Sequence, residues 1–315
     1  MKRYLARIVS FTTLLIATMP LALWAQPEAV AVITELKLNR GDVQIRPPGK
    51  KAPEKPAPLQ SLYAGTQIVA TKDATAVILF TEGMKTATID ERNSPFEIKA
   101  PEAKAGQSSA GMKQMASLLL GKKKPPTYIA LAVRGGKHPP TLIAPRETKL
   151  MAEAPTFKWM GMEMQPGTLR VYGPEGVVWT AENIALTQIK YPSSAPRLKP
   201  GVEYSWSIEK KGFPAEKARF TLLSPEEAKP IQEQLKSLDA AGGISKTTLV
   251  ILKANFLLSQ GLLYEARELL AEAVRVDPDE PVVHLLLGET YEKSGLKSLA
   301  QEEYGEAQFL SRISQ

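Results

Sequence analysis

Side chains that commonly carry out catalysis or bind metals are scarce in this chain. It contains two histidines, His138 and His284, and no cysteine. A transition-metal site needs several such ligands at defined spacings, which these two histidines do not supply. His138 lies in a Gly/Pro-rich stretch at 135–140, and His284 lies within an apolar helical pattern, where packing explains its presence. We therefore expect no metal and no cofactor.

Carboxylates are the remaining candidates for chemistry. The chain has 33 Asp and Glu residues, but no spacing among them indicates a general acid–base pair in one cleft. Nucleophile elbows, His-Glu-x-x-His motifs and phosphate-binding loops are absent from the sequence. The acidic cluster 277–280 lacks the spaced ligands of a calcium loop and predicts a turn in which Asp277 or Asp279 caps the next helix. The sequence favours a non-enzymatic protein; the alternative is an enzyme with a carboxylate cleft.

Residues 1–25 have the layout of a secretory signal peptide. Lys2, Arg3 and Arg7 precede an apolar run, and Ala25 offers a cleavage site. The alternative is an uncleaved membrane anchor. No second long apolar run follows, so we expect no stable membrane span after cleavage. An exported chain without cysteine suits a bacterial periplasm, so we predict a periplasmic or secreted protein.

The remaining sequence has the composition of a folded, weakly basic protein. Apolar residues make up 43% of the chain and the net charge is +7. This charge is mild and spread along the chain, so we expect no nucleic-acid partner. The length of 315 residues is sufficient for two or three domains.

Residues 26–104 are predicted to form an all-β domain. Short apolar runs alternate with Gly-containing turns, at 30–36, 41–45, 65–71, 76–80 and 83–89. The order of the motifs resembles a FecR-type β domain: Gly41-Asp42-Val43, then Gly65-Thr66, then a strand ending in Thr71, an alternating apolar strand, and an acidic-Gly turn at Glu82-Gly83. The chain departs from that family at Met84, where a serine is usual, and in a Pro/Lys-rich insertion at 47–58.

Residues 105–136 are predicted to form an amphipathic helix, ending near residue 123, and a linker. Lys122-Lys123-Lys124-Pro125-Pro126 ends the helix, and four apolar residues recur at helical spacing: Met112, Met115, Ala116 and Leu119. We expect this helix to pack on the neighbouring sheet. A binding groove or a membrane-surface helix is the alternative.

Residues 137–223 are predicted to form a second β domain. Apolar residues alternate with polar ones from Val202 to Glu209, as in a strand with one buried face. Leu198-Lys199-Pro200-Gly201 followed by Tyr204 resembles a tyrosine corner, whose hydroxyl bonds back to the preceding turn. With Trp159 expected in the core, this region resembles an immunoglobulin or fibronectin type III sandwich.

Residues 224–315 are predicted to be all helical. Ser224-Pro225-Glu226-Glu227 has the pattern of a capping box. Small residues then recur 34 apart, the period of tetratricopeptide helix pairs: Ala254 and Gly288, Gly261 and Gly295, Ala266 and Ala300, Ala273 and Ala307. The resemblance to that family implies a groove formed by the first helix of each repeat. Its lining would be Thr248, Ile251, Asn255 and Leu258 from the first unit, and Val282, Leu285, Glu289 and Glu292 from the second.

These observations predict a multidomain protein with an all-β N-terminal domain, a β-sandwich middle domain and all-α C-terminal helical hairpin repeats. Its expected function is that of an exported scaffold, binding protein partners in the cell envelope through the repeats. One alternative is binding of a glycan or peptidoglycan by the β domains, through aromatic residues such as Tyr63, Phe80, Tyr172 and Trp179. Another is periplasmic signalling, implied by the similarity of FecR-type domains to the periplasmic halves of sigma-factor regulators.

Overall fold

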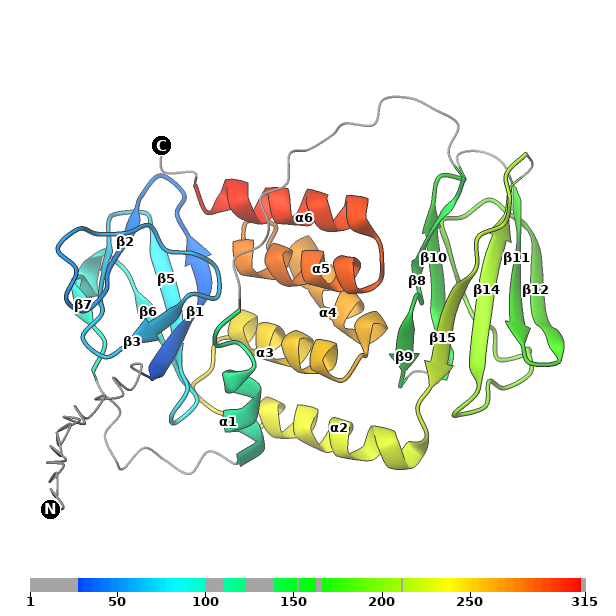
Figure 1. Ribbon diagram of the computed structural model, residues 1–315, viewed down its shortest axis with the longest axis horizontal. Helices are drawn as coiled ribbons and strands as arrows, with labels where there is room; N and C mark the ends of the chain where they lie inside the picture. Colours follow the sequence, from blue (N-terminus) through cyan, green and yellow to red (C-terminus); the bar gives the residue numbers. More distant parts are fainter. Residues whose placement is uncertain are drawn as a thin grey trace, which may run out of the picture.

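The computed structural model describes residues 28–99, 110–122, 139–151, 153–162, 166–210 and 212–312. Two β-sheet regions come first in the sequence and a helical region follows them, which confirms the expected multidomain β-then-α layout. In space the order differs, because the C-terminal helices lie between the two β regions (Figure 1). Residues 1–25, which are predicted to be a signal peptide, His138 and most of the predicted linker lie outside the described residues.

The first β region consists of two sheets around one core. A four-stranded sheet has the order β3-β1-β5-β6 and a three-stranded sheet the order β2-β4-β7. Gly41 is required at its turn because a Cβ there would lie 2.2 Å from the carbonyl oxygen of Lys72. The strands are β1 (Ala29–Lys37), β2 (Val43–Arg46), β3 (Ser61–Tyr63), β4 (Gln67–Ala70), β5 (Thr75–Phe80), β6 (Lys85–Ile89) and β7 (Phe96–Glu97).

A short helix, α1 (Ala110–Ser117), follows the first β region. Met115, Ala116 and Leu119 are fully buried, as the helical spacing predicts. The helix ends at Ser117 and not near residue 123; the chain continues through turns to Lys122. Residues 105–109 of the predicted helix lie outside the described residues.

The second β region also has two sheets with a shared core. The five-stranded sheet has the order β12-β11-β14-β15-β9 and the three-stranded sheet the order β13-β10-β8. The hydroxyl oxygen of Tyr204 accepts a hydrogen bond from the backbone N–H of Lys199 at 2.8 Å, which confirms the tyrosine corner. Trp159 is buried in the core, also as predicted. The strands are β8 (Thr141–Ala144), β9 (Thr148–Leu150), β10 (Thr156–Met160), β11 (Gly167–Gly173), β12 (Gly176–Ile184), β13 (Gln188–Lys190), β14 (Glu203–Glu209) and β15 (Ala218–Leu222).

The C-terminal helices are α2 (Pro225–Asp239), α3 (Lys246–Ser259), α4 (Leu263–Val276), α5 (Pro281–Lys293) and α6 (Lys297–Leu310). The capping box at Ser224 and Glu227 is confirmed. The expected cap of α5 by Asp277 or Asp279 is wrong, because Pro281 takes the first helical position and Glu280 therefore becomes the cap.

The residues repeated every 34 positions lie where helices touch or turn. A Cβ added to Gly288 of α5 would lie 2.6 Å from the ring of Tyr304 on α6, so glycine permits this close contact. Gly261 and Gly295 both have positive φ, at 74° and 77°, at the turns after α3 and α5.

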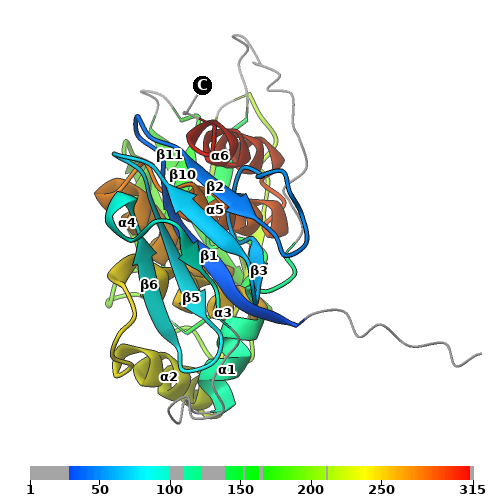
Figure 2. The same ribbon diagram turned by 90° about the vertical axis from the view of Figure 1, so that its left-hand side faces the viewer.

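Figure 2 shows the sheet that contains β1 in front of α3 and α5. One core joins residues from β1 and β5 to α1 and to the helices α2–α6. Among the described residues, no helix is both long and apolar enough to cross a membrane.

Candidate functional site

The eight residues expected to line the groove lie on α3 and α5, but most of them are covered. Glu289 is half-buried and Glu292 is exposed; the other six are buried, namely Thr248, Ile251, Asn255, Leu258, Val282 and Leu285. Partner binding by these residues stays a prediction. Other segments of this chain, namely β1 and the turn after α1, contact the same helices.

Strand β1 covers the beginning of α3. The Thr248 hydroxyl lies 2.8 Å from the Thr34 hydroxyl and also 2.8 Å from Oε1 of Glu35, to which it donates. The same carboxylate accepts the backbone N–H of Thr248 at 3.2 Å and the hydroxyl of the helix cap, Ser245. The N-terminus of a helix attracts an anion, and here Glu35 is that anion.

The beginning of α5 contacts β1 in a related way. Glu280 is fully buried, and its two carboxylate oxygens accept the backbone N–H of Leu36 at 3.1 and 3.2 Å. Oε1 also accepts the N–H of Val282 at 3.2 Å. Burial raises the pKa of Glu280 to about 8, although nearby Lys37, which pairs with Asp277, acts in the opposite direction. A carboxyl group in this position joins two parts of the chain that are far apart in sequence.

The turn after α1 reaches the middle of α5. The ammonium group of Lys122 pairs with Glu289, which lies 3.9 Å from Lys293 as well. Burial lowers the pKa of Lys122, against the opposite effect of Glu289. On α3, Asn255 occupies the position 34 residues before Glu289 and is only 4% exposed, yet its Nδ2 has no hydrogen-bond acceptor within the described part of the chain.

The second β region contacts the opposite ends of the helices. The hydroxyl oxygen of Tyr264 on α4 accepts the backbone N–H of Thr156 at 2.9 Å, and Oε1 of Glu265 accepts that of Met151 at 2.6 Å. Lys158 of β10 donates to both oxygens of Glu268, at 2.7 and 3.0 Å. Burial raises the pKa of the Tyr264 hydroxyl. The helices are thus attached to a β region on each side.

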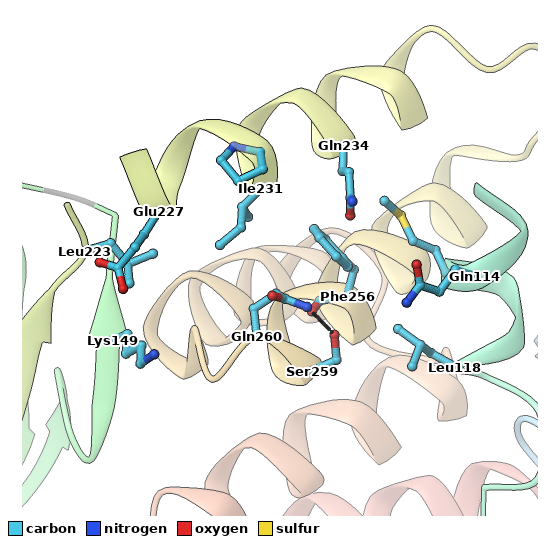
Figure 3. A pocket seen from close by; sticks show the side chains of 12 residues that line it. Gln114, Leu118, Lys149, Leu223, Glu227, Ile231, Gln234, Phe256, Ser259 and Gln260 are labelled. Carbon is cyan, nitrogen blue, oxygen red and sulfur yellow. Dashed lines mark hydrogen bonds between the residues drawn. The ribbon is translucent and has the colours of Figure 1, made fainter. Parts of the chain in front are cut away.

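An open cleft lies between α1, α2, α3 and β9 (Figure 3). Its volume is about 540 Å³. Ile231 of α2 and Phe256 of α3 point into it from facing walls, with Leu118 below them (Figure 3). Three amide side chains add hydrogen-bonding groups, from Gln114, Gln234 and Gln260. Lys149 and Glu227 lie at one end.

No pattern in the sequence predicts this cleft. Its walls come from four elements spread over residues 114–260, so no local pattern identifies it. The apolar face of α2, to which Ile231 belongs, was recognisable from its spacing. That pattern does not reveal that α1 stops short of closing the space beside it.

His284 is engaged in a structural contact. Its Nδ1 lies 2.6 Å from the carboxylate of Glu303 and its Nε2 lies 2.8 Å from the carbonyl oxygen of Pro278. Burial lowers the pKa of His284, but acceptors at both ring nitrogens outweigh it, so the pKa is raised. Within the ranges that the structure describes, no three His, Asp or Glu side chains form a group suited to a metal ion.

The aromatic residues considered for glycan binding are all half-buried and lie in different regions. Tyr63 and Phe80 belong to the first β region, whereas Tyr172 and Trp179 belong to the second. Trp179 packs edge-on against Tyr191, with ring centroids 5.3 Å apart, and the ammonium group of Lys217 lies 3.9 Å from the ring centroid of Tyr172. Trp179 and Tyr172 thus pack against side chains of this chain.

A scan of family models and a search of curated proteins find no match to this chain. The class of protein is therefore defined by the fold alone. It is a multidomain protein with a sheet-rich N-terminal part and a helical C-terminal part that bridges two β regions.

Proposed function

We propose that this chain is an exported, non-enzymatic scaffold of the bacterial cell envelope, whose helical repeats mediate protein–protein interaction. In this proposal the first β region is a FecR-like domain and the second an immunoglobulin or fibronectin type III-like sandwich. The helices α3–α6 are two tetratricopeptide-like hairpins, for which the 34-residue spacing and the close contact between Gly288 and Tyr304 are the support.

The observation that carries the proposal is the attachment of both β regions to the same helical region. Glu280 accepts the N–H of Leu36 on one side, and Glu265 accepts that of Met151 on the other. Hydrogen bonds from backbone groups to buried or half-buried carboxylates fix orientation as well as distance. A protein that holds two domains in a fixed arrangement is suited to positioning partners relative to each other.

The cleft beside α3 offers the surface for a partner. Apolar side chains such as Ile231 and Phe256 lie within it, and the amides of Gln114, Gln234 and Gln260 border it. An amide side chain both donates and accepts, so it can pair with the N–H and C=O groups of a peptide backbone. An apolar floor with polar borders is the usual composition of a protein interface. We therefore assign an extended segment of a partner protein to this cleft.

The ionisable groups with shifted pKa values support a role without catalysis. Glu280 bonds to backbone N–H groups, His284 to Glu303 and Pro278, and Tyr264 to Thr156. Shifted pKa values mark active sites when the group faces a cleft, but structural ion pairs and buried contacts shift them too. None of these three groups lines the cleft.

Site-specific photocrosslinking tests this proposal. A photoreactive residue is placed at Gln234 of the full chain, expressed in bacteria, in three backgrounds: unchanged, Ile231→Glu and Gln232→Glu. The last two add the same charge at adjacent positions, one inside the cleft and one exposed on α2. We expect a discrete crosslinked protein in the unchanged and Gln232→Glu backgrounds and its loss with Ile231→Glu. An equal yield in all three, or no crosslinked protein in any, would contradict the assignment.

A further inference from the structure

The chain segment that follows α1 lies across the helical face on which the groove was predicted. Leu119 is fully buried in the core that α3 and α5 share, and Lys122 pairs with Glu289 of α5. Helix α1 contacts α3, and Lys122 after it contacts α5, so the chain reaches both repeats. Figure 1 shows α1 beside the start of α3.

The attachment of this segment resembles that of a bound peptide. Its backbone N–H groups at Leu118, Leu119 and Leu120 bond within the segment itself, to the carbonyls of Gln114, Ala116 and Ser117. Gly121 donates to the hydroxyl of Ser61, on the first β region. The contacts with the helical face are the buried apolar side chains and the ion pair to Glu289. An apolar anchor followed by a charge is how short segments bind helical grooves.

The segment after α1 leaves one buried hydrogen-bond donor of this helical face, on Asn255, without an acceptor among the described residues. Asn255 and Glu289 occupy equivalent positions of the two repeats, so they lie on the same face of α3 and α5. Glu289 has Lys122, whereas Nδ2 of Asn255 is buried without an acceptor among the described residues. A buried donor without an acceptor is unfavourable, because it has lost its hydrogen bonds to water. A segment that supplied a carbonyl oxygen there would bind this face more favourably.

We propose that Met115–Lys122 is an internal occupant of the helical face, displaced by a partner-protein segment of matching chemistry. That segment carries an apolar side chain in the place of Leu119, a lysine or arginine three residues later, and a backbone carbonyl for Asn255. This inference rests on the proposed scaffold function and names the kind of partner. Met115 and Leu118 also line the cleft, so displacement joins cleft and groove into one surface.

A peptide-binding measurement with the full chain tests the proposal. The probe is a dye-labelled synthetic peptide with the sequence of Ala110–Lys122, followed by fluorescence anisotropy. The release variant is Leu119→Ser with Lys122→Glu, and the matched control is Lys113→Glu, an exposed change in the same segment. We expect the release variant to bind the peptide at least tenfold more tightly than the unchanged protein and the control. Equal binding by all three proteins, or binding by none, overturns the proposal.

A charge exchange identifies the contact. In a variant with Leu119→Ser and Lys122→Ser, which leaves no charge at position 122 of the chain, Glu289→Lys is expected to abolish binding of the original peptide and to restore binding of a peptide carrying Lys122→Glu. Hydrogen exchange on the unchanged protein covers the case in which the release variant does not fold. The amides of Leu118–Leu120 should exchange by an opening that leaves α3 and α5 protected. Exchange of all these amides only together, by global unfolding, overturns the proposal.

These results separate the two proposals. Peptide binding without any crosslink at Gln234 would support the displaceable segment and contradict the assignment of the cleft. A crosslink that depends on Ile231, with no peptide binding to a folded release variant, would support the scaffold function and contradict the proposal that Met115–Lys122 is displaced by a partner.

Discussion

The carboxylate of Glu280 holds the backbone N–H of Leu36 between its two oxygens, at 3.1 and 3.2 Å, although 244 positions separate the two residues. The same side chain caps α5 through Val282. One residue therefore caps the beginning of α5 and attaches the first β region to it. Replacing it should affect the helix and the contact between regions together.

Glu280→Ala is expected to lower the free energy of unfolding by about 1–3 kcal/mol, because it leaves the buried N–H of Leu36 without an acceptor. Urea unfolding followed by circular dichroism measures the change. Asp279→Ala is the matched control: it removes an adjacent, exposed carboxylate and should alter the free energy by less than about 0.5 kcal/mol. Equal effects of the two substitutions would contradict the role of Glu280.

The raised pKa of Glu280 predicts a pH dependence of stability. The folded protein holds this proton with a pKa of about 8, whereas the ordinary value is 4.5, so the folded state binds more protons between these values. Stability contributed by this group therefore falls as the pH rises from about 4.5 to about 8. Glu280→Gln, which stays neutral, should flatten this part of a melting-temperature profile. An unchanged slope in the variant would show that other groups cause it.

His284 also makes the folded protein less stable as the pH rises, but for a different reason. Its pKa is raised above 6.5 because Glu303 and the carbonyl of Pro278 accept from both ring nitrogens. The charged imidazole stabilises the folded state fully below pH 6.5, and this contribution is lost as the pH rises through the raised pKa. NMR titration of the imidazole should report a pKa above the ordinary value. Glu303→Gln should lower that pKa, and a pKa that stays the same would exclude the ion pair.

Gly288 tests the packing of α5 on α6. A methyl group at this position meets the Tyr304 ring at 2.6 Å, so Gly288→Ala should destabilise the protein by about 1–3 kcal/mol despite the better helix propensity of alanine. Gly305→Ala on α6 is the control, since its added Cβ meets nothing within 4 Å. That substitution should stabilise the helix by roughly 0.5–1 kcal/mol. Thermal unfolding of both variants measures the opposite signs.

Local features of the sequence predicted local structure well. The capping box at Ser224, the hydrogen bond of Tyr204 to the turn before its strand, and the burial of Trp159 all depend on residues close in sequence or on simple alternation. The cap of α5 was mispredicted because two aspartates precede Glu280, and the position of Pro281 decides which residue is the cap.

The arrangement of the β regions and the helices in space could not be predicted from local sequence patterns. The groove residues were assigned to one helical face, but sequence patterns do not tell which surface lies against that face. Thr248 contacts Thr34, and Glu289 contacts Lys122, across separations of 214 and 167 residues. Contacts of this kind depend on the docking of whole elements, so no periodicity encodes them.

The central position of the helices has a consequence for the order of assembly during synthesis. Both β regions leave the ribosome before α5 exists, yet β1 finds its buried acceptor, Glu280, only at the start of that helix. Until then the N–H of Leu36 lacks the acceptor that it has in the finished protein. The first β region therefore reaches its final set of hydrogen bonds only after the C-terminal helices have been synthesised and have docked on it.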